Sequence, residues 1–182
     1  MKKVLSIVLA MLFIMSVPIF ASAETTTPDE IPADVYQQYV DETPEGYYLA
    51  EVKKIVEDED WYRIEALYLP LVQTRAADIS GTKYVDVYYS GIGVNIMRYL
   101  LSATFRVKYD GSLPECISFA HQRTYKYDNP GALTFDVTSE RRELGAGYAA
   151  LIVTFDAYWD DSYVETKSYR NSIACDEYGE IY

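Results

Sequence analysis

The stretch YLLSATFRVKY, residues 99–109, decides the fold of this chain. Its odd positions hold Tyr, Leu, Ala, Phe, Val and Tyr, whereas Ser, Thr, Arg and Lys occupy four of its five even positions. Because successive side chains of a strand point to opposite faces of a sheet, this period of two predicts a strand with one buried face.

Similar patterns follow on both sides of this stretch. Residues 83–89 and 133–137 alternate in the same way, and residues 149–159 are apolar on nearly both faces, as in a central strand. Gly, Pro, Asn and Asp between these segments predict short turns. Strands joined by short turns pair antiparallel, so we predict an all-β fold for residues 75–182, an antiparallel sandwich or small barrel.

The N-terminal part of the mature chain predicts a short helical arm before the sheets. Residues 24–46 form an acidic leader with several prolines, and a helix at 33–41 could begin after Pro32. Residues 47–69 carry apolar side chains at helical spacing, but residues 62–68 also alternate as a strand would. We predict helix here and assign 47–74 as a helical arm, with strand as the open alternative.

The first 23 residues have the features of a secretory signal peptide. Two lysines at positions 2 and 3 precede an apolar run at 4–20, and Ala-Ser-Ala at 21–23 fits a cleavage site after Ala23. Cleavage leaves 14 basic and 28 acidic side chains, a formal charge of −14. We therefore expect a secreted bacterial protein that binds neither nucleic acid nor, once cleaved, a membrane, because both partners require a basic surface.

The two cysteines, Cys116 and Cys175, predict a disulfide, because an even pair in an exported chain is usually oxidised. The bridge would close a loop of about 60 residues and contribute roughly 4 kcal/mol. Two free thiols, or half of a metal site, are the alternative. Strand alternation places Cys116 on the face opposite Ile117 and Phe119, away from the core.

The chain ends in SIACDEYGEI, residues 172–181. This ending resembles the last hairpin of small exported Gram-positive proteins of unknown function, which also combine a signal peptide with a Tyr- and Thr-rich β domain. The resemblance extends loosely over the C-terminal half of the chain. It implies export and a β architecture, and it brings no activity with it.

Four residues are candidates for catalysis. His121 is the one histidine, and with Arg123 it interrupts an otherwise apolar strand face. The pair could form a polar site in which Arg123 holds a carboxylate, or a structural imidazole bonded to a backbone carbonyl. Asp136 and Asp156 share the outward parity of two successive strands, which suits either a glycosidase pair or solvated surface acids. A small extracellular hydrolase is thus the alternative to a binding protein, and no cofactor is expected.

Two acidic clusters could bind calcium through carboxylate oxygens, residues 58–60 and the pair Asp160 and Asp161. Neither follows a known calcium-loop pattern, so no metal is predicted. Solvated turns are the ordinary explanation for such clusters.

Tyrosine is the most unusual feature of the composition, with 19 residues in 182. Its flat ring and single hydroxyl suit stacking on sugars and contacts with proteins. Tyrosines of outward parity therefore predict a binding surface for a cell-envelope glycan or an extracellular protein. The alternative is that tyrosine is simply a good strand former on partly covered faces. If the N-terminal arm crosses the sheet and covers tyrosines, a shielding role for the arm gains support instead. The predicted binding residues are Tyr84, Tyr88, Tyr158 and Trp159.

Overall fold

The computed structural model describes residues 31–71, 78–90, 93–125 and 133–182. The predicted signal peptide and the first part of the leader lie outside these residues. Within them, no helix has the length and apolar character needed to cross a bilayer.

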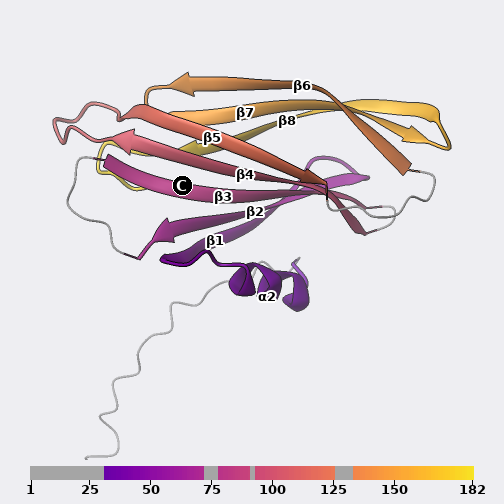
Figure 1. Ribbon diagram of the computed structural model, residues 1–182, viewed down its shortest axis with the longest axis horizontal. Helices are drawn as coiled ribbons and strands as arrows, with labels where there is room; N and C mark the ends of the chain where they lie inside the picture. The colour runs from indigo at the N-terminus through magenta and orange to yellow at the C-terminus, as the bar shows by residue number, and fades with distance from the viewer. Residues whose placement is uncertain (1–30, 72–77, 91–92, 126–132) are drawn as a thin grey trace, which may run out of the picture.

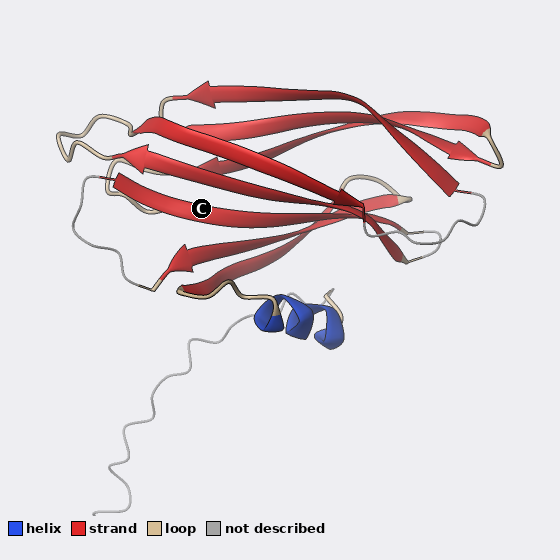
Figure 2. Ribbon diagram, viewed as in Figure 1, coloured by secondary structure: helices blue, strands red, loops and turns tan. Residues whose placement is uncertain are grey.

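The chain forms two antiparallel sheets stacked face to face, which confirms the predicted sandwich (Figures 1 and 2). Strand order follows chain order within each sheet, so neighbouring strands are joined as a simple meander. The five-stranded sheet contains β1 (Tyr47–Val56), β2 (Trp61–Pro70), β3 (Asp78–Tyr89), β4 (Val94–Arg106) and β5 (Glu115–Tyr125); the three-stranded sheet contains β6 (Leu133–Gly145), β7 (Tyr148–Trp159) and β8 (Ser162–Ala174).

The main core fills the space between the sheets. The odd positions of the 99–109 stretch from Tyr99 to Val107 are all buried there, as their period of two predicts. They meet apolar side chains of β7, such as Phe155. Trp61 of β2 lies edge-on to Phe155 with ring centroids 5.4 Å apart, so β2 also belongs to this core.

The prediction of helix for residues 47–69 is wrong, because β1 and β2 form a hairpin there. Both faces of β2 are covered: Trp61 and Leu67 face the main core, whereas Ile64 and Ala66 face the opposite side. A strand buried on both faces has apolar residues at all spacings, which resembles helical periodicity. Asp58 closes the hairpin turn, and its Oδ1 accepts from the backbone N–H groups of residues 60 and 61 at 2.9 and 3.0 Å.

The predicted short helix is confirmed as α2 (Ala33–Asp41), directly after Pro32. It lies on the side of the five-stranded sheet that faces away from the three-stranded sheet (Figure 1). Tyr39 is its one fully buried side chain and belongs to a second, smaller core with Ile64 and Tyr68 of β2. The sandwich therefore continues as a third layer at this position.

Different contacts hold the two sheets together at their two sides. On one side, Glu115 at the start of β5 forms a β-bridge with Ala146, just after β6. On the other side, the ammonium of Lys83 donates to the carbonyl oxygen of Ser172 at 2.6 Å. Because β8 is an edge strand, this bond satisfies a carbonyl that its own sheet leaves unpaired.

The predicted disulfide between Cys116 and Cys175 is wrong, since both are free thiols. Gly147 lies between the two segments: its N–H donates to the carbonyl of Pro114 and its carbonyl accepts from the N–H of Cys175, both at 2.8 Å. The backbone of Gly147 therefore lies between the segment of Pro114 and the segment of Cys175. Two hydrogen-bonded spacings place these segments about 10 Å apart, beyond the roughly 7 Å that a disulfide permits between Cα atoms.

The predicted orientation of Cys116 away from the core is also wrong. A bulge in the β4–β5 register pairs Thr104 with Ser118 but Phe105 with Cys116, so Ile117 is skipped. The bulge reverses the parity at the start of β5. As a result, Cys116 packs against the main core together with Phe119.

Candidate functional site

Several predicted site residues converge at the end of the three-stranded sheet next to the β7–β8 turn. The register places Asp136 of β6 directly opposite Asp156 of β7. The turn between Trp159 and Ser162 contains only two residues, which both have positive φ, 48° and 59°. This is the conformation that tight hairpins require. The predicted residues brought together are Asp136, Asp156, Tyr158, Trp159, Asp160 and Asp161.

The outer face of this end presents two tyrosines and a chain of hydroxyl contacts. Tyr158 and Tyr163 are cross-strand partners with ring centroids 6.0 Å apart in an edge-to-face arrangement. The Tyr163 hydroxyl lies 3.0 Å from that of Thr166, and Thr166 donates to Asp156 at 2.5 Å. Tyr163 is 59% exposed, so its ring is open to a ligand. We call these residues the hairpin-end site: Asp136, Asp156, Tyr158, Tyr163 and Thr166.

The two carboxylates give this site a negative potential. The side-chain carboxylate of Asp136 forms no hydrogen bond or ion pair with any residue that the structure describes. The pKa of Tyr158 is raised above its ordinary value by desolvation and then by the charges of Asp156 and Asp136. Like charges directly opposite each other destabilise a sheet, so this pair is an unfavourable arrangement for the fold alone.

The remaining two predicted binding residues lie elsewhere, on the outer face of the five-stranded sheet. Tyr88 is only 7% exposed because α2 covers it, so the prediction that it is accessible is wrong. Its ring stacks on Tyr62 with centroids 4.8 Å apart and planes 6° apart. Tyr84 is half-buried and lies edge-on to Tyr68 at 5.1 Å. We call these four residues the tyrosine face: Tyr62, Tyr68, Tyr84 and Tyr88.

A buried ionic network beside the tyrosine face was not predicted. Asp86 of β3, which is fully buried, accepts from Nε and Nη2 of Arg98 on β4 at 2.7 and 2.6 Å. The Tyr39 hydroxyl donates to the same carboxylate at 2.5 Å, and Glu42 pairs with Arg98. Burial and the charge of Asp86 raise the pKa of Tyr39, so its phenol stays protonated. A sequence signal was present for Asp86, since it shares the parity of Tyr84 and Tyr88.

His121 and Arg123 lie between the edges of the two sheets. One carboxylate oxygen of Glu140 on β6 accepts a hydrogen bond from Arg123 at 2.8 Å. The other oxygen lies 3.5 Å from Nε2 of His121. Arg142 donates to Nδ1 of His121 at 3.3 Å, so both ring nitrogens are engaged. Arg123 thus holds a carboxylate of the chain itself, and no hydroxyl of a described residue hydrogen-bonds the imidazole. The arrangement joins β5 to β6 and resembles no nucleophilic triad.

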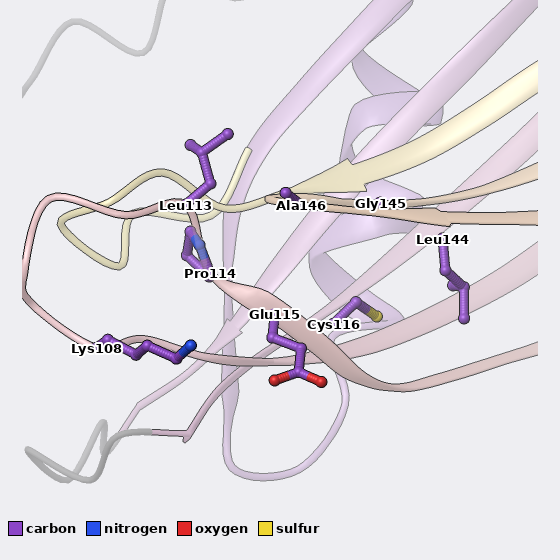
Figure 3. Close-up of a pocket in the computed structure, with 8 residues that line it drawn as sticks. All are labelled: Lys108, Leu113, Pro114, Glu115, Cys116, Leu144, Gly145 and Ala146. Atoms are coloured by element: carbon purple, nitrogen blue, oxygen red, sulfur yellow. The ribbon is translucent and has the colours of Figure 1, made fainter.

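A pocket of about 430 Å³ lies where β5 begins and β6 ends. Figure 3 shows Glu115 and Cys116 on one side and Leu144 on the other. Burial raises the pKa of the Cys116 thiol, which makes it a poor nucleophile. The four predicted catalytic residues do not line this pocket. The residues that line it are Lys108, Leu113, Pro114, Glu115, Cys116, Leu144, Gly145 and Ala146.

The predicted calcium ligands occupy turns. Asp58 uses one oxygen for the β1–β2 turn and the other for Lys167 at 2.5 Å, and Asp160 and Asp161 form the β7–β8 turn. Across the described parts of the chain, no three His, Cys, Asp or Glu side chains are grouped to hold a metal ion.

Comparison with known proteins gives no relative: no family model matches the chain, and neither curated proteins nor solved structures show a significant match.

Proposed function

We propose that this protein is an exported binding module that holds a cell-envelope glycan on the outer face of the three-stranded sheet. The observation that carries the proposal is the hairpin-end site, where a pair of tyrosine rings lies beside two carboxylates and a threonine hydroxyl. Export is supported by the basic and apolar N-terminal sequence that ends in Ala-Ser-Ala.

The chemistry of the site matches a sugar polymer. Tyrosine rings contact the apolar faces of sugar rings, and carboxylate and hydroxyl oxygens bond sugar hydroxyls. The outward side chains of β7 from Tyr148 to Tyr158 extend over about 33 Å, enough to contact several sugar units of an extended chain. Arg170 stacks over the Tyr148 ring at 5.0 Å, so the far end of this face is also aromatic.

Charge narrows the class of glycan. The chain carries a formal charge of −12, and among the described residues no cation pairs with the two carboxylates of the hairpin-end site. Phosphate-rich polymers are repelled by such a surface. A neutral or amine-bearing polysaccharide therefore fits best.

A pull-down with purified cell-wall glycan tests the proposal. We expect Tyr158→Ala and Tyr163→Ala each to weaken retention by about two- to tenfold, as for the loss of one aromatic contact. Tyr178→Ala is the matched control, because Tyr178 is 74% exposed and lies outside the site. Retention that is equal in all three variants, or absent in the unaltered protein, would show that this face does not bind glycan. Retention of an extracellular protein in place of glycan would also contradict the proposal.

A small extracellular hydrolase is the second candidate, supported by the direct opposition of Asp136 and Asp156. Cross-strand partners place their Cβ atoms about 5 Å apart, so the two carboxyl groups are able to reach the roughly 5 Å separation of retaining glycosidases. A reducing-sugar assay distinguishes the two functions. Hydrolysis that disappears in both Asp136→Asn and Asp156→Asn would establish the enzyme, whereas binding without product supports the module.

A further inference from the structure

The tyrosine face is built by the sheet alone. The stacked pair of Tyr62 and Tyr88 and the edge-to-face pair of Tyr68 and Tyr84 come from β2 and β3. The carboxylate of Asp86 is held in two-point contact by Arg98 of the next strand. None of these contacts requires α2. The aromatic and charged surface would therefore persist if α2 left.

The hold of α2 on this surface is narrow. Tyr39 is the one α2 side chain that is fully buried; it donates its phenol to Asp86 and places its ring 5.6 Å from the Arg98 guanidinium. The carbonyl of Tyr39 accepts from the Tyr68 hydroxyl at 2.9 Å. Glu42, directly after the helix, pairs with Arg98. Two residues three positions apart, Tyr39 and Glu42, thus supply the polar contacts, and Val35 and Tyr36 add apolar packing.

These contacts are of the kind that a separate ligand makes. A phenol and a carboxylate one helical turn apart meet a fixed guanidinium and a fixed carboxylate, and the flanking tyrosines supply apolar area. The contacts connect residues 47 and 56 positions apart, so they do not depend on the short link between α2 and β1.

We propose that the tyrosine face is an interaction surface for a peptide helix that presents a tyrosine and an acidic side chain three positions apart, and that α2 fills it as a removable cover. A partner of this chemistry gains access only when α2 leaves. The N-terminal arm thereby keeps the second tyrosine surface closed. This inference concerns a different face from the hairpin-end site and does not depend on glycan binding.

Uptake of a labelled synthetic peptide of residues 31–46 by the mature chain tests the inference. The Tyr39→Ala chain should lose its own cover and bind the peptide. The Gln37→Ala chain is the matched control, because Gln37 is an exposed α2 residue whose change leaves the cover in place. Since a tethered helix competes at about millimolar effective concentration, we expect binding to the control to be weaker by roughly a hundredfold. A peptide with Tyr39→Phe and Glu42→Gln should bind neither chain.

Equal binding to both chains, or no binding to a folded Tyr39→Ala chain, would overturn the inference. If circular dichroism shows that the Tyr39→Ala chain does not fold, a second variant tests the inference. A protease site is placed in residues 43–46 of the otherwise unaltered chain, which is cleaved after folding. Release of the α2 fragment on dilution to micromolar concentration supports a removable cover, and retention at nanomolar concentration refutes it. Tyr158→Ala should leave peptide uptake unchanged.

Discussion

The buried pair of Asp86 and Arg98 allows a sharp prediction about stability. Asp86→Asn keeps the shape of the side chain but leaves the guanidinium of Arg98 buried beside a neutral amide, with Glu42 as its remaining anionic partner. Breaking a buried pair in this way costs about 3–5 kcal/mol, because Arg98 loses the fully buried one of its two anionic partners. For a domain of this size, that loss lowers the Tm by roughly 6–20 °C. Thermal and urea unfolding followed by circular dichroism measure it.

The same two strands supply a matched control. Arg106 and Asp78 form a similar two-point pair between β4 and β3, at 2.8 and 3.1 Å, but both side chains are about half exposed. Solvent and salt screen such a pair, so Asp78→Asn should leave the unfolding curve unchanged within error. The contrast isolates the effect of burial, because both variants make the same chemical change.

A triple variant completes the argument. Asp86→Leu and Arg98→Met replace both charges by apolar groups, and Tyr39→Phe removes the phenol that would otherwise lose its acceptor. Replacing a whole buried pair is often neutral or stabilising, so the triple variant should recover most of the lost Tm. A triple variant as unstable as Asp86→Asn, or an Asp86→Asn protein with an unchanged Tm, would refute the reasoning.

Three further outcomes are expected. Maleimide should label Cys116 in the folded protein and Cys175 only after unfolding, because burial raises the pKa of Cys175 to about 11; protection of both thiols in urea would indicate a disulfide. Asp161→Gly should raise stability by about 1 kcal/mol, since glycine adopts the positive φ of this turn without strain, and an unchanged Tm would contradict this. Despite desolvation, hydrogen bonds from Lys167 and backbone N–H groups lower the pKa of Asp58. Its contribution to stability is present above the ordinary pKa of Asp and is lost as pH falls through the lowered value, so acid unfolding profiles of Asp58→Asn should fall less steeply.

Two strands of the sandwich could be predicted because only one face of each is fully buried. Residues 99–109 and 133–137 alternate between core and solvent or a polar surface, and their period of two reports this directly. The helix α2 was marked by Pro32, which directly precedes its first residue. Such signals are local, so one segment of sequence is enough to recognise them.

The first hairpin could not be recognised because it depends on the layer above it. On β2, Trp61 packs in the core between the two sheets and Ile64 packs with α2. Nothing within residues 47–69 indicates that a second layer covers this strand. The free cysteines have a similar cause. An insertion as small as the bulge at Ile117 reverses the direction of Cys116, and the β6–β7 turn at Gly147 separates it from Cys175.

The predicted binding residues fall into two groups, exposed and covered, because the sequence does not reveal where the covering helix docks. Parity places Tyr84, Tyr88 and Tyr158 outward, and all three do lie on outer sheet faces. Parity cannot say which outer face remains open, because that depends on where α2 docks. Docking is decided by Tyr39 meeting Asp86, a contact across 47 positions of sequence. The tyrosine excess therefore has two structural roles, an open face at the hairpin end and a closed one under α2, and the variants proposed for each leave the other intact.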